Sequence, residues 1–550
     1  MSLMSNLFVG QSGLQTSHNA LNTTAHNLAN VDTKGYTRQQ VSQGTRAYQT
    51  LEVKNNGIGP KQVGTGVSYN DCKQVRNEFL DSSYRREQGR LAFYDVSKKA
   101  LEEIQDQFQE LNGTQFSQSM DNLWEAVQEL AKDPTNATVQ GLLITRADEF
   151  VTRAKSVYEG LKDYQKNLDS TVSDMVKRIN NIGDNILNLN KEIVKIEAGK
   201  VEKANDLRDV RNKLIDELGT YGKIDYMEDN FGNVQLMFEG SYFITSDHVN
   251  HMNVDTKLSS SVGFATPYWE YAAKSHMDDN GNKMIDSIDG ANVFDLTQNI
   301  STSTNTDIGK LKSTLLARGD HYGNYHDMIG DNDYYSKNIS GSVIMNVQAE
   351  FDQMVHNIEM AINEIFIQAQ SNPAVLNGMN NNSDYVLFTI SNESDKLIYD
   401  VPDGKKGTVL TGLTIENSQV NPKLIAEPTM FTFKCIDGSE DIDTMEKLKK
   451  AFMDADYSLN PSLLSKESFT TYYNSLISQI ANSGDVVNSI TISQEYTVGA
   501  VNSAREQVVG VSSDEELGYM IQFQNAYNAN SRYINTVSEM LEHLVTSLGN

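Results

Sequence analysis

The sequence predicts a multi-domain α plus β protein, in which the N- and C-terminal segments together form a discontinuous helical coiled-coil or rod domain and the central inserts are mainly β. Three observations predict this class. Apolar residues recur with heptad spacing over residues 144–196, similar repeats lie at both ends of the chain, and the middle carries short alternating runs. At roughly 100–200 residues per domain, a chain of 550 residues holds about three to five domains.

The first predicted helix begins near the N-terminus. Leucine recurs at every seventh residue with small residues in between, and residues 1–31 contain no Asp, Glu, Lys or Arg. A cleaved secretory signal needs a basic start and a compact apolar stretch, and this segment has neither. Two interpretations stay open: a neutral amphipathic helix that packs on a partner, or an uncharged export signal that is not cleaved. The leucines of this stripe are Leu7, Leu14, Leu21 and Leu28.

The longest helix is predicted over residues 144–196. Its apolar positions alternate steps of three and four, and Gln165 is the single polar residue among them. A repeat kept over this many heptads is typical of coiled-coil packing, and at 1.5 Å per residue the helix is about 80 Å long. Gly160 and Gly183 lie off the stripe, and each permits a bend because glycine costs about 1 kcal/mol of helix propensity.

The middle of the chain changes to β patterning from about Tyr221. Short alternating runs at 234–238 and 241–244 are separated by turns rich in Asn, Asp and Gly. A helix is predicted near 343–370, after which strands resume. The later predicted strands lie at 385–390, 408–415 and 430–435, within a proline-rich stretch that is typical of loops and edge strands.

After Pro461 the chain is predicted to be helical to its end. A second stripe with alternating steps of three and four begins at Met520. One polar residue, Asn530, occupies a stripe position. A single polar residue at such a position fixes the register of paired helices at some cost in stability. Each terminal stripe is narrow and needs a partner, and the other end of the same chain is the nearest candidate. The C-terminal stripe comprises Met520, Phe523, Tyr527, Asn530, Ile534, Val537, Leu541, Leu544 and Leu548.

These elements give a plan of helix, β and helix, with both termini at one end. We expect four parts, listed in chain order. They are residues 1–36 with 515–550 as a terminal helical coiled-coil domain, 37–220 with 341–372 and 461–514 as a long-helix rod domain, 221–340 as a β domain, and 373–460 as a second β-rich region.

Composition excludes several classes of function. The chain has 46 Lys and Arg against 73 Asp and Glu, a net charge of −27, which argues against nucleic acid as a partner. No run approaches the roughly 18 apolar residues that a membrane span needs. Two cysteines, Cys72 and Cys435, supply neither a disulfide framework nor a CxxC metal site.

Three stretches imitate functional motifs. The glycine-rich residues 57–66 include Pro60 and precede no amphipathic helix, so a loop or hairpin is favoured over a phosphate site. Residues 276–287 resemble a calcium loop but lack both end carboxylates. His321 and His326 lack a third zinc ligand at a fixed spacing. We therefore expect no catalytic residue, no metal and no cofactor, and an enzyme carried in the β insert with a metal at these histidines is the weaker alternative.

Both ends resemble a known family. The run from Asn27 through Asn30 to Thr33, Gly35 and Tyr36 resembles the N-terminal motif of bacterial flagellar axial proteins, with Leu28 where that family usually carries isoleucine. In this motif Asn30 begins the helix stop, Gly35 supplies a turn and Tyr36 anchors the returning strand. Residues 514–517 and 523–541 resemble the matching C-terminal helix.

Internal segments narrow the resemblance to the hook-associated protein 1 family. Residues 64–67, 75–76 and 79–80 are similar to that family, and so is the run 308–320. The long helical rod and the chain length also fit it better than a hook protein. A hook or distal-rod axial protein is the alternative.

The resemblance implies a structural protein of the bacterial flagellum, secreted by the flagellar type III route and located outside the cell. Its subunits would form an axial tube between hook and filament that is needed for filament attachment. The implied partners are further copies of the chain, the hook protein, the second junction hook-associated protein, the export apparatus and an export chaperone on the C-terminal helix. Both terminal stripes, with Asn27, Asn30, Gly35 and Tyr36, are the expected assembly residues.

Overall fold

The computed structural model describes residues 3–52, 61–108, 116–199, 202–258, 262–277, 283–329, 332–372, 375–376, 386–390, 412–430 and 432–548. The chain divides into two compact units. Unit 1 holds residues 1–91, 177–251 and 494–550, and unit 2 holds residues 92–176 and 252–493. Three of the four borders fall inside helices, namely α2 (Glu78–Phe108), α4 (Ala137–Glu197) and α12 (Phe469–Val509), and the fourth lies between residues 251 and 252.

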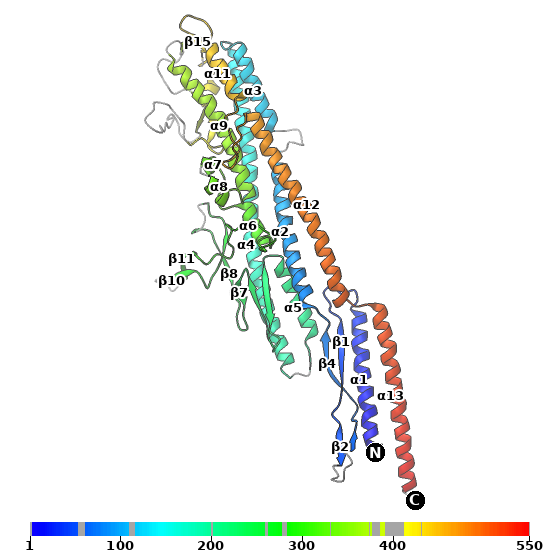
Figure 1. Ribbon diagram of the computed structural model, residues 1–550. Helices are drawn as coiled ribbons and strands as arrows, with labels where there is room; N and C mark the ends of the chain where they lie inside the picture. Colours follow the sequence, from blue (N-terminus) through cyan, green and yellow to red (C-terminus); the bar gives the residue numbers. More distant parts are fainter. Residues whose placement is uncertain are drawn as a thin grey trace. The chain divides into compact units, whose positions relative to one another are not determined.

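Unit 1 contains both ends of the chain. Helices α1 (Leu3–Ala29) and α13 (Ser513–Leu548) run side by side, with the two termini at the same end of the pair (Figure 1). The chain leaves α1 into two antiparallel strand pairs, in which β1 (Gln39–Thr45) pairs with β4 (Val67–Gln74) and β2 (Gln49–Glu52) pairs with β3 (Lys61–Val63). The described part of the glycine-rich stretch is therefore strand β3 and the turn after it, while residues 53–60 lie outside the described residues.

A helix–sheet layer forms the apolar core of unit 1. Helix α5 (Asn205–Gly219) leads into an antiparallel sheet of β5 (Ile224–Glu228), β6 (Val234–Phe238) and β7 (Ser241–Ile244). A Cβ at Gly183 of α4 would lie 2.6 Å from Phe243 Cζ, so this glycine permits a close approach of the sheet and does not mark a bend. Asn190 locks the two layers, because its amide donates to the Val234 carbonyl at 2.9 Å and accepts from the Val234 N–H at 3.2 Å.

Unit 2 contains a large helical core. Its helices are α3 (Phe116–Lys132), α6 (Lys310–Arg318), α7 (His326–Ile329), α8 (Asn332–Asn338), α9 (Val343–Ser371), α10 (Pro422–Ala426) and α11 (Ile442–Met453), with parts of α2, α4 and α12 and the 3₁₀ turn Pro428–Met430. Aromatic rings of four helices meet at its centre, where Phe116 lies 4.9 Å from Phe351, 5.2 Å from Tyr473 and 5.5 Å from Phe150 between ring centroids.

The strands of unit 2 form two-stranded ladders. They are β8 (Met252–Asp255) with β9 (Thr266–Trp269), β10 (Lys274–Met277) with β11 (Lys283–Ser287), β12 (Val375–Leu376) with β15 (Lys434–Cys435), and β13 (Phe388–Ile390) with β14 (Ser418–Val420). The α plus β class with helical ends is therefore confirmed.

The heptad stripe of α4 is largely buried, as the period predicted. Leu161, Ile179 and Ile186 are fully buried, and the polar Gln165 is satisfied because its amide donates to the Arg318 carbonyl at 2.7 Å and accepts from Gln348 at 2.8 Å. Met175 and Leu189 are only half-buried and Ile196 is 43% exposed. A straight helix drifts by about 20° per heptad against a strict repeat, so the buried face moves to neighbours such as Val176.

The β-rich interpretation of residues 373–460 is corrected in part. Residues 412–415 are not a strand, and of the expected strand at 430–435 only Lys434–Cys435 is β. Helix α11 was not expected, although Met445, Leu448 and Phe452 supply its buried face and Asp441 caps it by accepting from the Thr444 N–H at 3.1 Å. Residues 377–385 and 391–411 lie outside the described residues.

The proposed β domain at 221–340 is also grouped differently. Strands β5–β7 belong to unit 1, whereas β8–β11 and the short helices α6, α7 and α8 belong to unit 2. The four-part division of the chain therefore stays a proposal. The reason for the different grouping is that β6 packs on α4 through Asn190 and Val234, a contact that no local pattern announces.

Candidate assembly interface

The two terminal helices pack antiparallel in one register. A Cβ at Gly10 would lie 2.7 Å from Ile534 Cγ1, and a Cβ at Gly13 would lie 2.5 Å from Asn530 Oδ1. Further along α1, the His18 ring lies 6.2 Å from the Tyr527 ring. Residue numbers on α13 thus decrease as those on α1 increase, which shows that the helices are antiparallel. Glycine allows the two backbones to come close.

The covered face of α1 is small and polar. Its most buried side chains are Ser12, Thr16, Ser17, Ala20, Thr24 and Asn27, none more than 6% exposed. On the side away from α13 the helix meets β4, where the Val67 N–H donates to Ser12 Oγ at 3.1 Å. Leu7, Leu14, Leu21 and Leu28 are only half-buried. The leucine stripe therefore lies at the edge of the covered face and does not form it. The reason is that β4 and α13 approach α1 so closely that only small side chains fit between them.

The predicted stripe of α13 does lie toward α1. Val537 is 3% exposed, and Met520, Phe523, Tyr527, Asn530, Ile534 and Leu541 are half-buried. Leu544 near the end is 43% exposed, and Leu548 is the last residue of the helix. Large apolar side chains remain on the other faces of both helices: Met4, Phe8, Leu517, Ile521, Met540 and Val545 are between 45% and 69% exposed.

The motif after α1 is built as the sequence predicted. The helix ends at Ala29, and Asn30 follows with its amide donating to the His26 carbonyl at 3.0 Å. Gly35 has φ +85°, a conformation that other residues adopt with strain. Tyr36 turns back and its hydroxyl donates to Asn27 Oδ1 at 2.8 Å, and burial raises the pKa of this tyrosine.

Asn27 uses every hydrogen-bonding position of its buried amide. Its Nδ2 donates to the Gln39 carbonyl at 2.8 Å and to Glu516 Oε2 at 3.1 Å. Its Oδ1 accepts from the Tyr36 hydroxyl and, at 3.0 Å, from the Gln39 N–H. One side chain therefore connects α1, the returning strand and α13.

Glu516 and Arg38 complete this arrangement, and sequence reasoning missed both. The Glu516 side chain is 3% exposed and accepts from Arg38 Nε at 2.9 Å. The Arg38 N–H donates to the Val509 carbonyl at 2.9 Å at the end of α12, and its guanidinium lies 5.6 Å from the Tyr519 ring centroid. Glu516 lies 478 residues from Arg38 in sequence, so no local spacing could have paired them.

A chain of ion pairs continues from this point into the rest of unit 1. Arg76 bonds Asp81 at 3.0 Å, Asp81 bonds Arg505 at 2.6 Å, Arg505 bonds Asp216 at 2.8 Å, and Asp216 bonds Arg85 at 2.6 Å. Burial alone would raise the pKa of Asp81, but Arg76, Arg505 and Arg85 outweigh burial and hold that pKa below its usual value. These residues join the end of β4 to α2, α5 and α12.

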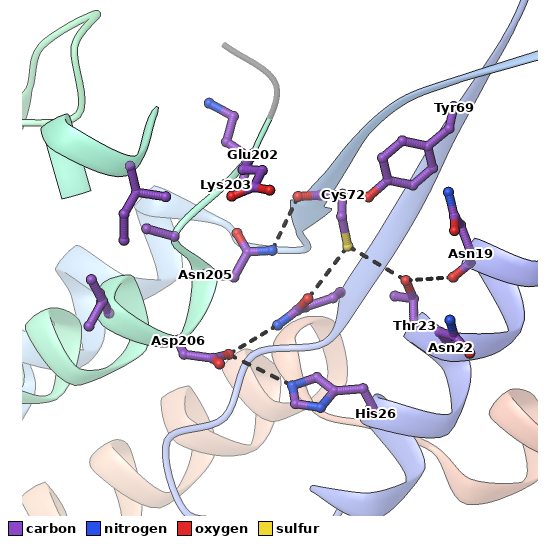
Figure 2. A pocket seen from close by; sticks show the side chains of 14 residues that line it. Asn19, Asn22, Thr23, His26, Tyr69, Cys72, Glu202, Lys203, Asn205 and Asp206 are labelled. Atoms are coloured by element: carbon purple, nitrogen blue, oxygen red, sulfur yellow. Dashed lines mark hydrogen bonds and ion pairs between the residues drawn. The ribbon is translucent and has the colours of Figure 1, made fainter. Parts of the chain in front are cut away.

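A pocket of about 750 Å³ lies in unit 1 among residues of α1, β4 and α5 (Figure 2). Figure 2 shows Cys72 near Thr23, and His26 facing Asp206 at 3.7 Å. The Cys72 thiol donates to Gln39 Oε1 at 3.5 Å. Burial raises the pKa of that thiol, which is opposite to what a nucleophilic cysteine needs. Most polar groups of this pocket bond one another or adjacent residues, as Lys203 does to Glu197 at 3.2 Å, and nothing in the pocket assigns a ligand.

The histidines considered for metal binding have other partners. His321 lies 2.6 Å from Asp320 and 3.1 Å from Asp327, and these hydrogen bonds raise its pKa to about 10. A protonated imidazole has no lone pair for zinc. His326 lies 2.9 Å from Asn324, and His276 lies 2.6 Å from Asp286. Among the described residues, no three His, Cys, Asp or Glu side chains are grouped to hold a metal ion.

The search for a membrane-spanning helix gave a negative result. In the described part of the chain no helix carries a stretch long and apolar enough to cross a bilayer.

Three family models match the chain. Residues 101–373 match the flagellar hook-associated protein FlgK helical domain, residues 7–37 match the flagella basal body rod protein, and residues 507–547 match the C-terminal part of the flagellar basal body rod FlgEFG proteins. The second and third matches coincide with α1 and α13, the two helices of the interface described above.

Relatives match along nearly the whole chain. Flagellar hook-associated protein 1 of Bacillus subtilis (strain 168) is 25% identical over 566 residues, with 99% of each chain covered. Flagellar hook-associated protein 1 of Salmonella typhimurium is 23% identical over 567 residues, with 97% of this chain and 98% of the relative covered. The solved structure of the flagellar hook junction protein FlgK from Burkholderia pseudomallei shares the fold, with TM-score 0.52 at 9% identity over 79% of this chain and 100% of that chain.

The fold and the matches at both ends point to one class: the chain is similar to structural proteins of the bacterial flagellum along nearly its whole length. Within this class it is a relative of flagellar hook-associated protein 1 along nearly its whole length, which confirms the resemblance noted in the sequence.

Proposed function

We propose that the chain is a structural subunit of the junction between flagellar hook and filament, outside the cell. In this role its subunits form an axial tube and are needed for filament attachment. The observation that carries the proposal is that α1 and α13, once paired, still expose large apolar side chains such as Phe8 at 59%, Ile521 at 61% and Val545 at 69%. Exposed apolar surface on a helix pair marks a site of further association.

The paired ends need neighbours for energetic reasons. Isolated helices gain little stability in water, and most helical stability comes from packing of an apolar face. The most covered side chains of α1 are small or polar, so this helix offers little apolar area for burial. Neighbouring subunits in a tube contact one another head to tail, and such contacts do not close on themselves. These neighbouring subunits cover the apolar side chains of α1 and α13 that stay exposed in the single chain.

The other partners follow from this role. The hook protein lies on one side of the junction and the second junction hook-associated protein lies on the other. A chaperone that covers the exposed face of α13 and the flagellar type III export apparatus act before assembly. The uncharged residues 1–31 belong to the export step. Charged residues at Ser5, Gln11 and Asn19 should retain the chain inside the cell, and normal secretion of this variant would contradict the export proposal.

The central test alters only the outer face of α13. Ile521→Asp with Met540→Asp places charges on side chains that are 61% and 53% exposed in the single chain. In a strain that lacks the native chain, we expect this variant to be absent from isolated hooks and the cells to lose their filaments. Asn525→Asp is the matched control, because it adds a charge at an exposed position of the same helix.

Two outcomes would contradict the proposal. Normal incorporation of the double variant would show that the outer face of α13 is not an assembly contact. Electron microscopy of labelled chain along the hook or the distal rod, with none at the junction, would favour the alternative axial role.

A further inference from the structure

Two buried polar side chains and one half-buried arginine lie at the base of the terminal helix pair, where α1 ends and α13 begins. We call Asn27, Arg38 and Glu516 the base node. Asn27 is 1% exposed and the Glu516 side chain is 3% exposed, and both are hydrogen-bonded within the node at 3.1 Å and 2.9 Å.

The node permits one alignment of the helices. A shift of α13 by one residue, about 100° around the helix axis, in the direction that replaces Glu516 with the next residue would put the apolar Leu517 against Asn27. Asn27 Nδ2 would then lose one of its two acceptors, and the Arg38 guanidinium would lose its bond from Nε. Buried polar groups left unpaired are costly, so alternative alignments are strongly disfavoured at this position.

The distal part of the pair has no comparable lock among its described residues. There the contact consists of Gly10 and Gly13 against Ile534 and Asn530, with half-buried leucines at the edge. Asn530 donates its amide to the Ala526 carbonyl of its own helix at 3.0 Å, and within the described residues its side chain makes no hydrogen bond to α1. This part of the pair is therefore aligned by close packing and not by buried hydrogen bonds.

Arg38 also ties the node to the rest of unit 1. Its N–H donates to the Val509 carbonyl and its carbonyl accepts from the Val75 N–H, both at 2.9 Å. The preceding residue, Thr37, donates through its N–H and its hydroxyl to Asp209, at 3.1 and 2.6 Å. The node is therefore fixed to the ends of α12 and β4 and to α5.

We propose that Glu516 is a positioning residue that, with Asn27 and Arg38, sets the register of α1 against α13 and the direction in which this pair extends from the rest of unit 1 before assembly. This inference rests on the proposed function, because it assigns the node to the preparation of the terminal helices for neighbouring subunits. The parts of α1 and α13 that lie farther from the base node then pack against neighbouring subunits, while the base node is already formed in the single chain.

Hydrogen exchange on the full-length monomer tests the node directly. In Glu516→Ala, the amides of Arg38 and Gln39 should exchange at least about tenfold faster, because one charged acceptor of the node is lost. Incorporation into the junction should fall at least about tenfold by the same reasoning. Glu515→Gln is the matched control: this neighbour is 60% exposed and lies 3.3 Å from Arg38 Nη1, so both quantities should stay at the wild-type level.

A rescue experiment separates positioning from general destabilisation. Asn27→Asp places a carboxylate against Glu516 and should fail to assemble. Adding Glu516→Gln restores a donor–acceptor pair with reversed roles and should recover part of the incorporation. Wild-type exchange at Arg38 and Gln39 in Glu516→Ala, or a double variant no better than Asn27→Asp alone, would overturn the inference.

The failure of this inference can be told from failure of the proposed function. If only the node is wrong, Ile521→Asp with Met540→Asp still blocks incorporation while Glu516→Ala exchanges like the wild type. If the assembly role is wrong, the outer-face variant incorporates normally while Glu516→Ala still exchanges faster at Arg38 and Gln39.

Discussion

The core of unit 2 and the terminal helix pair of unit 1 are both made of long helices, yet they are held together differently. In unit 2 the rings of Phe116, Phe351 and Tyr473 meet in a fully buried core. In the terminal pair the most covered side chains of α1 are small or polar, and large apolar groups such as Ile521 stay exposed.

This difference separates a part of the chain whose core is complete within one subunit from a part that we expect to be completed by contacts with neighbouring subunits. Burial of large apolar side chains is the main source of folding stability, and unit 2 completes it within one chain. On the terminal pair, large apolar side chains such as Phe8 and Val545 stay exposed in the single chain. Under the proposed function, we expect the folding of the ends to be coupled to assembly, which would stabilise them by mass action.

The largest expected effect comes from Leu541→Asp on α13. This half-buried residue lies on the stripe toward α1, and a charge there should reduce incorporation to background. Both tryptophans, Trp124 and Trp269, belong to unit 2. The melting curve followed by tryptophan fluorescence should therefore match the wild type, and a lowered midpoint would mean that the ends support the folding of unit 2.

The corresponding change in the unit 2 core is Leu161→Ala in α4. Leu161 is fully buried in the unit 2 core, and truncation of such a residue costs about 2–5 kcal/mol. The tryptophan-monitored transition should move to lower temperature and lower denaturant concentration, and the free energy of unfolding should fall by about 2–5 kcal/mol. An unchanged midpoint would mean that the heptad stripe is not a packed core.

A pH dependence should be found in unit 2 and not in the terminal pair. Burial raises the pKa of Glu350 and Asp352 to about 7 and that of Glu359 to about 8, and all three lie on α9. Their neighbours are polar: Asn460 and Gln479 donate to Glu350, the Tyr325 and Ile415 N–H groups donate to Asp352, and the Ser418 hydroxyl donates to Glu359.

The sign follows from proton binding. The folded state holds these protons to higher pH than the unfolded chain, so the stability they contribute is complete below about pH 4 and is lost as pH rises through 7 to 8. We expect the tryptophan-monitored melting temperature to fall by about 5 °C between pH 5.5 and pH 8.5. His321, with its raised pKa, acts in the same direction above pH 6.5.

Glu359→Gln isolates one of these carboxyls. The amide is neutral at every pH and can still accept from Ser418, so the variant should lose less stability over the same pH interval. A melting temperature that is constant or rises with pH in the native chain would contradict the assignment of buried protonated carboxyls.

The smallest effect concerns close approach of the helices. Gly10→Leu should favour helix formation in α1, but its Cβ would lie 2.7 Å from Ile534 and push α13 away. Incorporation should fall severalfold without any change in unit 2. Gly499→Leu is the control, because no atom lies within 4 Å of its Cβ, and equal defects in the two variants would argue against a tight contact at Gly10.

Sequence patterns predicted the long elements well because those elements rest on local periodicity. The stripe of α4, the strands β6 and β7 and the turn at Gly35 all follow from residues near one another in the chain. Helix α11 was missed because its stripe is short and lies between residues that favour turns. The contact of α4 with β6 depends on Asn190, a single polar residue whose partner is 44 positions away.

The candidate interface could be predicted only in part for a similar reason. The stripes at both ends predicted that α1 and α13 pair, and the motif around Asn27 predicted the helix stop. The choice of small residues as the covered face of α1 could not be read from apolar periodicity, which ranks leucine above serine and glycine. Glu516 looked like any acidic residue in the first turn of a helix, because its partners Asn27 and Arg38 lie at the other end of the chain.

Hydrogen exchange on the dilute monomer, compared with the assembled junction, tests the central claim most directly. We expect the amides of α4 between Ile144 and Ile193 to be strongly protected in both states. Those of α1 before Ala20 and of α13 after Phe523 should exchange quickly in the monomer and become protected on assembly. Strong protection of the distal parts of both terminal helices in the dilute monomer would show that they are complete without neighbours, and would contradict the coupling of their folding to assembly.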